Sequence, residues 1–580
     1  MKLSNYIAQF LVEKGCTHVF GYQGGAVTHL IDSLYAVDGI RFIGCGHEQA
    51  AAFAAEGYAR VTGRCGVALA TSGPGATNLI TGIGSAYFDS IPCVYLTGQV
   101  NTYEYKGALT VRQLGFQETD IVSVVTPIVK YAVRITDPTR IRYELERAFF
   151  TAQAGRKGPV LLDIPMDIQR ADVEEKTLAG YEPNPETRSP INITRMIEAL
   201  NMSRRPVLLV GGGARLSGGT HLLNTLVQSL HIPVVTSLMG RDAVDNTLPE
   251  FCGMLGSYGN RYANLTVANS DLVLAIGTRL DTRQTGTLPQ SFAREAKLIR
   301  VDIDPNELKH KIRPDEIGVE EDAKAFLEQL LCEFQRITSD WSAWHTVIAG
   351  YKARYPSFMK SKFSDPNYLV SMLGSSMDKD EIICLDVGQN QMWCAQSLLL
   401  NARQRLLTSG GMGAMGFSLP AAIGAQYAAP DRKIIAFAGD GGMQMNIQEL
   451  ALLKREHLPV KVIVLNNQSL GMIRHFQEMY FSSRYAGTVK DYKAPDFCAV
   501  ASAYGIQSLR AERIENLEAV RELISSPEPV VIEVTLPQHT YVFPRLSVNH
   551  AIEEQEPPVD KAQFLQDMIV KPFQRNGKGE

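Results

Sequence analysis

The sequence lacks an excess of charge of either sign and lacks any long apolar run. Its 580 residues carry a formal net charge of −4, so charge gives no reason to expect nucleic acid or an anionic membrane as a partner. No stretch of about 18 apolar residues occurs, so we expect no membrane-spanning helix. The N-terminal segment "MKLSNYIAQFLVEKG" has no long apolar core and no small-residue cleavage site. We therefore expect a domain helix there and not a signal peptide.

Cysteine is scarce and scattered. The chain has nine cysteines and no C-x-x-C pair. An odd number of cysteines in a large chain favours reduced thiols in a cytoplasm over a disulfide framework, and we do not expect a structural zinc site.

Short apolar strands alternate with amphipathic helices through most of the chain, which is the pattern of α/β domains with parallel sheets. The length favours three or four domains. The polar, proline-containing segment Glu174–Pro190 is a good linker. We predict domains at residues 1–175, 190–345 and 365–544. The polar tail, residues 545–580, is expected to be a lid or a partly disordered end.

Polar residues follow two apolar strands in the third predicted domain. Asp440 comes after "KIIAFAG", and Asn466 and Asn467 come after "VKVIVL". Asn467 follows Asp440 by 27 residues, the length of one β–α–β crossover, so both would lie at the carboxyl edge of one sheet, where ligands bind. An Asp carboxylate, an Asn amide oxygen and a backbone carbonyl form an oxygen set suited to Mg²⁺. Gly441 and Gly442 would let a diphosphate approach the backbone at a helix N-terminus.

The alternative interpretation of "GDG" is a tight turn followed by an Asn-capped loop. The crossover spacing to "NN" favours the metal and diphosphate site, a combination that resembles thiamine diphosphate enzymes. A P-loop is excluded because no G-x-x-x-x-G-K-[ST] occurs.

A glutamate in the first predicted domain has the position that this chemistry needs. Glu48 follows a strand-like run and opens the Ala-rich helix of "HEQAAAFAAEGYAR". By itself such a carboxylate could serve only the helix dipole. In this cofactor class, a buried carboxylate bonded to the aminopyrimidine ring promotes removal of the C2 proton.

Over residues 1–540 the chain resembles the catalytic subunit of acetohydroxyacid (acetolactate) synthase. The resemblance rests on "FGYQGGA", "HEQAAAFAAEGYAR", "ATSGPGATNL", "GRKGPVLLDIP", "GMLGSYGNRYANL", "IGTRLDTRQTG", "SGGMGAMGFSLPAAIGA", "AGDGGMQMNIQEL" and "NNQSLGM". It implies three doubly wound parallel-sheet domains: pyrimidine-binding, middle and diphosphate-binding. The cofactor would lie between the first domain of one subunit and the third of another. A dimer would then be the smallest active unit, with a tetramer expected.

The same resemblance implies roles for the reacting side of the site. Glu48 would activate the aminopyrimidine, while Gly25 and Gln117 would border the reacting carbon. Arg283 would pair with the acceptor's carboxylate, for which a guanidinium offers bidentate binding. Pyruvate would be decarboxylated and its two-carbon unit transferred to a second carbonyl compound.

Cofactor contacts are implied in the same way. The Mg²⁺ ligands would be Asp440, Asn467 and the Ser469 carbonyl. The diphosphate and the bent cofactor would contact Gly388, Gln389, Asn390, Gly413, Met415, Gly441, Gly442 and Met472, with Met415 supporting the bend. FAD in a non-redox role would contact Arg156, Gly211, Gly212, Gly213, Gly256, Gly277, Arg279 and Asp302. On the text alone, "VLLVGGGARLSGG" is equally well a glycine-rich strand–helix turn, because no G-x-G-x-x-G occurs in register.

Several departures from the family pattern fall on the acceptor side. Phe476 stands where the family has a tryptophan that favours 2-ketobutyrate as acceptor. The other departures are Gln23 for proline, Met166 for lysine, Thr282 for aspartate, Asn390 for histidine, and Ser257–Tyr258 in "GSYG".

Four interpretations of these departures follow. In the first, the activity is the same as that of the family. In the second, pyruvate is still the donor, but the acceptor is a ketone such as the nucleotide-linked keto sugar of branched-chain deoxysugar (yersiniose-type) synthesis. A flavin-using pyruvate oxidase and a non-catalytic cofactor-binding subunit are the remaining alternatives. The sequence does not identify the acceptor or a regulatory subunit.

Overall fold

A computed structural model describes residues 1–184, 191–358, 362–378 and 380–574. The predicted start of the middle domain at residue 190, the end of the linker and residues 575–580 of the tail lie outside the described residues. The chain forms two compact units. The first unit comprises Met1–Glu186, Glu381–Gln391 and Leu406–Gln538, and the second comprises Thr187–Asp380, Met392–Arg405 and His539–Glu580.

The N-terminal domain is built on a six-stranded sheet of order β2-β1-β3-β4-β6-β5, with parallel pairings throughout. Its strands are β1 (His18–Gly21), β2 (Arg41–Gly44), β3 (Gly66–Ala70), β4 (Cys93–Gln99), β5 (Tyr131–Arg134) and β6 (Val160–Pro165). Its helices are α1 (Leu3–Glu13), α2 (Thr28–Ala36), α3 (Glu48–Thr62), α4 (Pro74–Asn78), α5 (Ile80–Phe88), α6 (Ile121–Val125), α7 (Ile141–Gln153) and α8 (Met166–Arg170). The predicted N-terminal helix is confirmed as α1.

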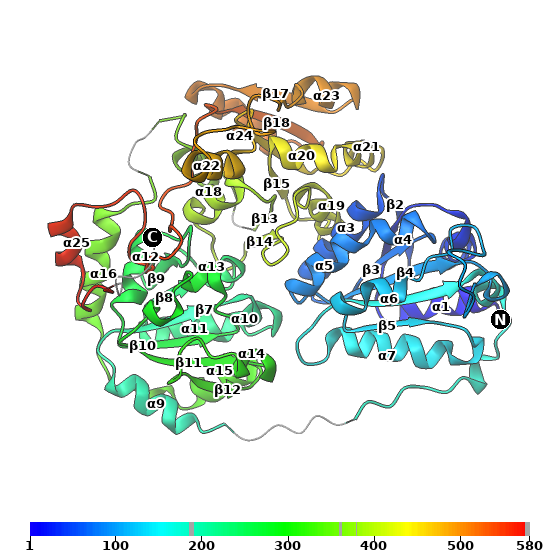
Figure 1. Ribbon diagram of the computed structural model, residues 1–580, viewed down its shortest axis with the longest axis horizontal. Helices are drawn as coiled ribbons and strands as arrows, with labels where there is room; N and C mark the ends of the chain where they lie inside the picture. The colour runs from blue at the N-terminus through cyan, green and yellow to red at the C-terminus, as the bar shows by residue number, and fades with distance from the viewer. Residues whose placement is uncertain (185–190, 359–361, 379, 575–580) are drawn as a thin grey trace. The chain divides into compact units, whose positions relative to one another are not determined.

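The second unit contains a sheet of order β12-β11-β10-β7-β8-β9 (Figure 1). Its strands are β7 (Pro206–Val210), β8 (Val234–Thr236), β9 (Phe251–Met254), β10 (Leu272–Ile276), β11 (Lys297–Asp302) and β12 (Ile317–Glu320). Its helices are α9 (Ile193–Met202), α10 (Gly212–Leu216), α11 (Thr220–Leu230), α12 (Arg261–Ala268), α13 (Thr282–Thr285), α14 (Pro305–Lys309), α15 (Ala323–Cys332), α16 (Ser342–Arg354), α17 (Pro366–Gly374) and α25 (Lys561–Asp567).

The C-terminal domain, in the first unit, has a sheet of order β14-β13-β15-β16-β18-β17. Its strands are β13 (Ile382–Leu385), β14 (Arg405–Thr408), β15 (Ile434–Gly439), β16 (Lys461–Asn466), β17 (Gln507–Ala511) and β18 (Val530–Thr535). Its helices are α19 (Ser418–Ala428), α20 (Asp440–Met445), α21 (Leu450–Arg455), α22 (Gly471–Tyr480), α23 (Phe497–Ala503) and α24 (Leu517–Ile524). Helix α18 (Gln389–Ser397) begins in the first unit and belongs to the second unit from Met392.

The strands are apolar along their whole length because the sheets are covered on both faces. All five residues of β7 and all six of β16 are buried, as expected for parallel strands between helical layers. The predicted α/β class with three parallel-sheet domains is confirmed.

Two helices join the N-terminal and C-terminal domains within the first unit. Helices α3 and α19 cross at backbone contact, since a Cβ added at Gly57 would lie 2.3 Å from the Ala421 carbonyl oxygen. A Cβ added at Gly424 would lie 1.8 Å from the Ala54 carbonyl oxygen. Only glycine permits this approach, so the crossing fixes how the start of α3 faces the C-terminal domain.

The described part of the tail belongs to the second unit. Asp567, at the end of α25, accepts a hydrogen bond from the Tyr351 hydroxyl through its carbonyl, at 2.7 Å. Its carboxylate pairs with Arg354 of α16 at 2.6 Å. A buried polar cluster therefore fixes α25 to α16, while the expectation of a lid or a partly disordered end stays a prediction.

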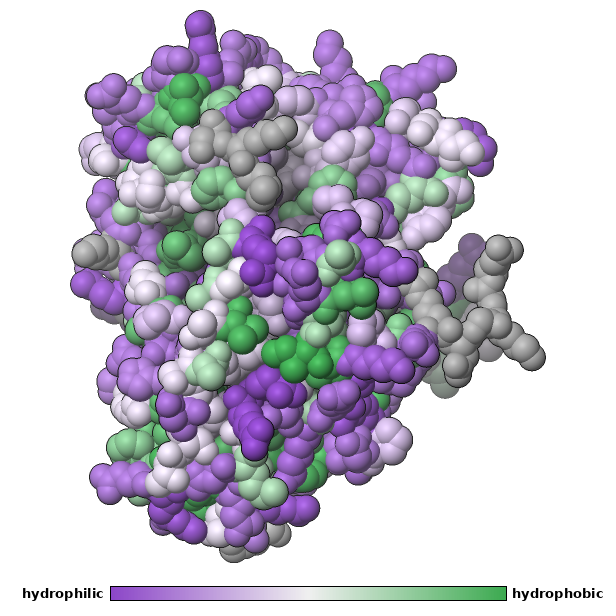
Figure 2. Space-filling model, turned by 90° about the vertical axis from the view of Figure 1, so that its left-hand side faces the viewer, coloured by the Kyte–Doolittle hydropathy of each residue, from purple (hydrophilic) through white to green (hydrophobic). Residues whose placement is uncertain are grey.

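None of the described helices has the length and hydropathy that crossing a bilayer requires. On the face shown in Figure 2, hydrophobic side chains gather in small groups between polar ones. All nine cysteines, which lie among the described residues, are free thiols, as the sequence predicts.

Candidate active site

The segments after β15 and β16 meet at one edge of the C-terminal sheet. These strands pair in parallel with Gly439 opposite Leu465, so both end at the same level. Asp440 accepts a hydrogen bond from the Gly441 amide at 2.8 Å through Oδ1. Its Oδ2 accepts one from the Ser469 amide at 3.1 Å. The segments that follow the two strands therefore meet through Asp440 and Ser469, while the predicted joint binding of a metal by Asp440 and Asn467 stays a prediction.

The Asp440 carboxylate is buried and held in place by neutral donors. Burial raises its pKa to about 6, while the two amides and the Tyr492 hydroxyl, which also donates to it, act in the opposite direction. A bound divalent cation would favour the ionised carboxylate by direct attraction. The buried Ser469 Oγ has no hydrogen-bond partner among the described residues. The oxygen groups here therefore fit Mg²⁺.

Helix α20 begins at Asp440 itself, so its first amides point to the same edge of the sheet. Nearby, Asn390 is 2% exposed, and its Oδ1 has no hydrogen-bond partner among the described residues. Its Nδ2 lies 3.1 Å from the position that an added Cβ would have at residue 439. It lies 3.3 Å from the position of an added Cβ at Gly388. The Nδ2 of Asn390 is a donor beside a helix N-terminus and fits a cradle for a phosphate group, whereas the unpaired Oδ1 is an acceptor and does not.

A predicted metal ligand, Asn467, and a predicted diphosphate contact, Gln389, bond to each other. The Asn467 amide donates to Gln389 Oε1 at 2.9 Å. A Cβ at Gly471 would lie 1.9 Å from the same oxygen. Gln389 thus lies across the start of α22, and glycine at position 471 is what leaves room for it.

Asp386 organises this edge of the sheet but was missed in the sequence analysis. Its Oδ1 accepts the Gly416 amide at 3.0 Å, and its Oδ2 accepts the Ser418 amide at 3.0 Å. A Cβ at Gly442 would lie 2.2 Å from Oδ1. Asp386 directly follows the buried strand β13 and precedes "VGQNQ". That is the pattern by which Asp440 was recognised, and it could have identified Asp386 too.

Met415 lies on the segment that Asp386 holds. Its Cε is 3.1 Å from the position of a Gly441 Cβ, so its side chain reaches the start of α20. Gly413 and Gly416 on either side have φ of 66° and 85°, a left-handed conformation that favours glycine. The structure therefore brings the predicted support residue to the predicted diphosphate cradle.

Glu48 is the first residue of α3 and is 7% exposed. The preceding His47 caps the helix by accepting the Gln49 amide at 3.0 Å. The side-chain amide of Asn78, at the end of α4, donates to Glu48 Oε2 at 2.9 Å. Glu48 Oε1 is 3.2 Å from the position of a Gly75 Cβ. Asn78 lies in the quoted motif "ATSGPGATNL" but received no role, since only the fold shows its proximity to Glu48.

Gly25 and Gln117 reach the same turn after β3 that borders Glu48. Beside Gly25, the Ala26 amide donates to Thr71 Oγ1 at 3.2 Å. A Cβ at Gly25 would meet no atom within 4 Å. Gln117 has φ of 64°, unusual for a non-glycine residue, and its Cβ is 2.9 Å from the position of a Gly73 Cβ. These predicted residues do converge in the N-terminal domain.

Helix α22 carries Met472 and Phe476. The Phe476 side chain is 42% exposed, and its ring centroid is 5.8 Å from that of Tyr480. Phe476 therefore lies on an accessible apolar side of the helix, where replacement of its ring changes what a neighbouring molecule would contact.

The glycines matched to FAD are explained in part by backbone packing in the second unit. A Cβ at Gly211 would lie 2.2 Å from the Gly277 carbonyl oxygen, and one at Gly213 would lie 2.7 Å from the Gly277 Cα. A Cβ at Gly256 would lie 2.5 Å from the Arg283 carbonyl oxygen. Residues 211, 277 and 302 follow or end neighbouring strands β7, β10 and β11. Gly212, Arg279 and Asp302 lie at that edge, which fits a nucleotide.

Two predicted residues belong to a different unit from their expected partners. Arg156 belongs to the first unit and donates to Ser90 Oγ at 2.9 Å, whereas the other predicted FAD residues belong to the second. Arg283 belongs to the second unit, where its guanidinium lies 5.8 Å from the centre of the Tyr258 ring.

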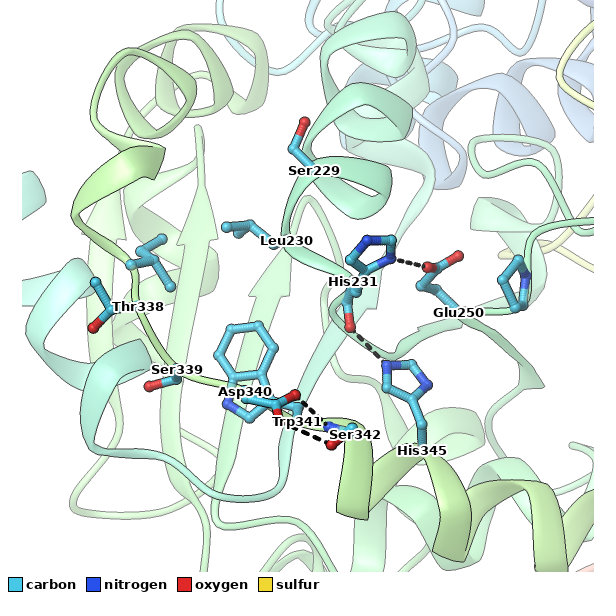
Figure 3. Close-up of a pocket in the computed structure, with 12 residues that line it drawn as sticks. Ser229, Leu230, His231, Glu250, Thr338, Ser339, Asp340, Trp341, Ser342 and His345 are labelled. Carbon is cyan, nitrogen blue, oxygen red and sulfur yellow. Dashed lines mark hydrogen bonds and ion pairs between the residues drawn. The ribbon is translucent and has the colours of Figure 1, made fainter.

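A groove of about 580 Å³ in the second unit is a different candidate. Figure 3 shows His231, Glu250 and His345 on one side of it. His231 Nδ1 pairs with Glu250 at 2.7 Å, and His345 Nε2 lies 2.6 Å from the His231 carbonyl. Asp340 accepts the Ser342 amide at 2.9 Å at the start of α16. These polar groups bind one another, and none of the predicted site residues lines the groove, so we do not assign it a function.

The fold and the cradle define a thiamine pyrophosphate enzyme. Three family models match: the N-terminal TPP binding domain over residues 1–124, the central domain over 193–330 and the C-terminal TPP binding domain over 386–534. Within this class the chain belongs to the acetolactate synthase family.

The relatives show this directly. The chain is 36% identical over 550 residues to the acetolactate synthase large subunit of Lactococcus lactis, covering 94% of each chain. It is 36% identical over 548 residues to the isozyme 2 large subunit of Escherichia coli, covering 94% of this chain and 97% of the relative. It is 37% identical over 576 residues to acetolactate synthase 2, chloroplastic, of Nicotiana tabacum, covering 95% of this chain and 85% of the relative.

Proposed function

We propose that the protein is a thiamine-diphosphate-dependent carboligase that decarboxylates pyruvate and joins its two-carbon unit to the carbonyl of a second 2-keto acid. The observation that carries this proposal is the meeting of Asp440 with Ser469 at the carboxyl edge of the C-terminal sheet. Membership of the acetolactate synthase family supports the choice of substrate. The keto-sugar alternative is not favoured, since the similar proteins from Lactococcus lactis, Escherichia coli and Nicotiana tabacum are acetolactate synthases.

When bound, thiamine diphosphate supplies an electron sink for the loss of CO₂ and carries the two-carbon unit. Asp440, Asn467 and the Ser469 carbonyl would hold Mg²⁺, and the amides at the start of α20 would face the diphosphate. Asp386 holds the Gly416–Ser418 turn, which would place Met415 against the cofactor. These residues would bind and orient the cofactor.

Glu48 would act on the aminopyrimidine ring. The Asn78 side-chain amide already donates to Oε2, so Oε1 would be the oxygen that bonds a ring nitrogen and holds a proton there. Burial of the Glu48 side chain strengthens this bond by reducing competition from water. Arg283 would pair with the carboxylate of the acceptor.

Further elements of the proposal concern cofactor and assembly. FAD would bind at the β7–β10–β11 edge without a redox role. The working enzyme would be a cytoplasmic dimer or tetramer, with each cofactor between an N-terminal domain and the C-terminal domain of another subunit. Two relatives are named large subunits, which supports a smaller partner subunit for this protein too.

The test is carboligation by the purified protein with thiamine diphosphate and Mg²⁺. With pyruvate alone we expect CO₂ and acetolactate, and with 2-ketobutyrate added we expect the mixed product. Glu48→Gln should lower the rate of CO₂ release and the rate of carboligation by at least 100-fold each, consistent with the size of general acid–base effects. Absence of CO₂ and of any ligated product from pyruvate would refute the proposal. Pyruvate-dependent flavin reduction without air would instead indicate a pyruvate oxidase.

A further inference from the structure

The turn that precedes Glu48 is held by the C-terminal domain. The Gly46 amide donates to both carboxylate oxygens of Glu449, at 2.9 and 3.1 Å. The His47 amide donates to the same carboxylate. Glu449 therefore binds the backbone of the two residues that immediately precede Glu48. All of these residues belong to the first unit.

A second side chain holds the other end of this turn. Arg455, on α21, donates to the Gly44 carbonyl oxygen at 2.7 Å. Gly44 ends β2 and Glu48 begins α3. The turn between them is thus fixed at its start by a cation and at its end by a carboxylate, both from one short stretch of the C-terminal domain.

Glu449 is an unusual residue to use for packing alone. It is fully buried, and burial raises its pKa to about 7, with the Gly46 amide acting in the opposite direction. Burying a carboxylate costs more than burying an apolar side chain unless specific hydrogen bonds compensate. The compensating bonds here come from the backbone amides of Gly46 and His47.

The lack of a side chain at Gly46 leaves room for the Glu449 carboxylate. A Cβ at position 46 would lie 2.8 Å from Gln448 Cγ and 3.0 Å from Glu449 Oε1. The glycine lets the carboxylate approach both amides, so the fit involves both domains. Glu449 also belongs to the 3₁₀ turn Ile447–Glu449 that follows α20, the helix that opens at Asp440.

We propose that Glu449 is a positioning residue that fixes the direction in which Glu48 leaves the turn. This inference rests on the proposed role of Glu48 in the carboligase reaction. The α3–α19 crossing fixes the body of α3, and Asn78 orients the Glu48 carboxylate, whereas Glu449 fixes the backbone one residue before it. Misplacement of a catalytic group by about 1 Å can cost about 100-fold in rate.

The principal variant is Glu449→Gln, which keeps the shape but turns one amide-accepting oxygen into a donor. The matched control is Arg41→Gln, which removes another contact between the same two domains, the Arg41–Glu456 ion pair, without touching residues 44–47. Hydrogen exchange of the peptide spanning residues 44–50 is measured in the cofactor-free protein. We expect at least tenfold faster exchange in Glu449→Gln and no change in Arg41→Gln.

The loaded protein supplies the functional readouts. We expect Glu449→Gln to slow exchange of the cofactor's C2 proton and to lower kcat by 10- to 100-fold. Its Kd for thiamine diphosphate should stay within twofold of the wild-type value, because Asp440 and the cradle are untouched. Arg41→Gln should leave all three quantities unchanged. Equal effects of the two variants would overturn the proposal, because they would indicate general loosening between the domains.

Gly46→Ala perturbs the same contact from the other domain and serves if Glu449→Gln does not fold. It should raise exchange over residues 44–50 and slow C2 exchange in the same way. Unchanged exchange over residues 44–50 in the folded variants would also overturn the proposal. If the wild-type protein does not turn over pyruvate, the proposed function fails, whereas hydrogen exchange in the cofactor-free protein still tests the contact between Glu449 and the turn.

Discussion

Asp89 accepts the backbone amide of Gly411 at 2.7 Å, and its other oxygen accepts the Gly410 amide at 2.9 Å. The same carboxylate pairs with Arg60 of α3 at 2.6 Å. Asp89 belongs to the N-terminal domain, whereas residues 410 and 411 begin the loop that leads to Met415. Each domain therefore holds a turn of the other domain through a carboxylate. Asp89 of the N-terminal domain holds residues 410 and 411, and Glu449 of the C-terminal domain holds the turn before Glu48.

Asp89→Asn should destabilise the protein. The substitution replaces one amide-accepting oxygen by a donor and leaves buried Arg60 with one fewer carboxylate, so we expect a loss of about 3 kcal/mol in the free energy of unfolding, as for other broken buried pairs. Urea denaturation of the cofactor-free protein measures it.

The control for this experiment is Asp32→Asn. Asp32 is 75% exposed and lies 3.5 Å from Lys2, so its loss should change stability by no more than about 0.5 kcal/mol. A similar effect of both variants would contradict the role assigned to Asp89.

Asp386→Asn should weaken cofactor binding. Its two oxygens hold the Gly416 and Ser418 amides, and the loss of one acceptor releases the segment that carries Met415. One such charged hydrogen bond contributes about 2 kcal/mol, so we expect a rise of roughly 30-fold in the Kd for thiamine diphosphate, measured by titration calorimetry. Asp431→Asn, at an exposed position, should leave the Kd unchanged. An unaltered Kd in Asp386→Asn would show that the segment is held without it.

Gly424→Ala and Gly350→Ala should change stability in opposite directions. A methyl at position 424 would overlap the Ala54 carbonyl where α19 meets α3, at an expected cost of about 3 kcal/mol. Gly350 lies inside α16, and its nearest neighbour would be 3.5 Å from an added Cβ. Alanine there should stabilise the protein by up to about 1 kcal/mol through helix propensity. Thermal unfolding of the two variants under the same conditions compares them, and equal shifts would refute the assigned close contact.

The sequence allowed prediction of features whose signals lie close together in the chain. Asp440 and Asn467 were found because one crossover separates two strand ends, and the start of α3 was found from Glu48 and its alanines. Asp89 and Glu449 could not be found in this way. Their partners, Gly411 and Gly46, lie more than 300 residues away in sequence, and a carboxylate that binds a backbone amide leaves no partner side chain to recognise.

The roles of several glycines likewise depend on partners that are distant in sequence. The run Gly211–Gly213 suggested a nucleotide loop, yet Gly211 and Gly213 also pack against Gly277, which sequence spacing cannot reveal. Conversely, Gly57 and Gly424 received no role from the sequence, and the structure shows that the α3–α19 crossing requires both.

His18 should make the protein sensitive to mild acid. Burial, and next the charge of Arg41, lower its pKa from 6.5 to about 4. Its ring lies 4.7 Å from that of Tyr427 and 5.9 Å from that of Tyr58, and Nδ1 is 2.9 Å from Thr17 Oγ1. Because the fold favours the neutral ring, this contribution to stability is complete above about pH 6.5 and is lost as pH falls toward 4.

His18→Gln should therefore lose less stability than the wild-type protein between pH 6.5 and 4.5. Urea denaturation at pH 6.5, 5.5 and 4.5 measures the difference. His221→Gln, at an exposed position, should follow the wild-type profile. Identical pH profiles for His18→Gln and the wild-type protein would show that protonation of His18 does not contribute.

Phe476→Trp should shift the choice of acceptor. Phe476 lies on the accessible side of α22, next to Tyr480, and the family resemblance assigns a tryptophan to this position for preference of 2-ketobutyrate over pyruvate. A larger ring adds apolar contact for the extra methylene of 2-ketobutyrate, and one methylene contributes about 0.8 kcal/mol. We therefore expect the product ratio from mixed substrates to move toward 2-ketobutyrate by about fourfold, measured by chromatography of the two ligated acids. Tyr480→Phe, which keeps the neighbouring ring, is the control, and an equal shift in both variants or none in Phe476→Trp would remove α22 from the acceptor site.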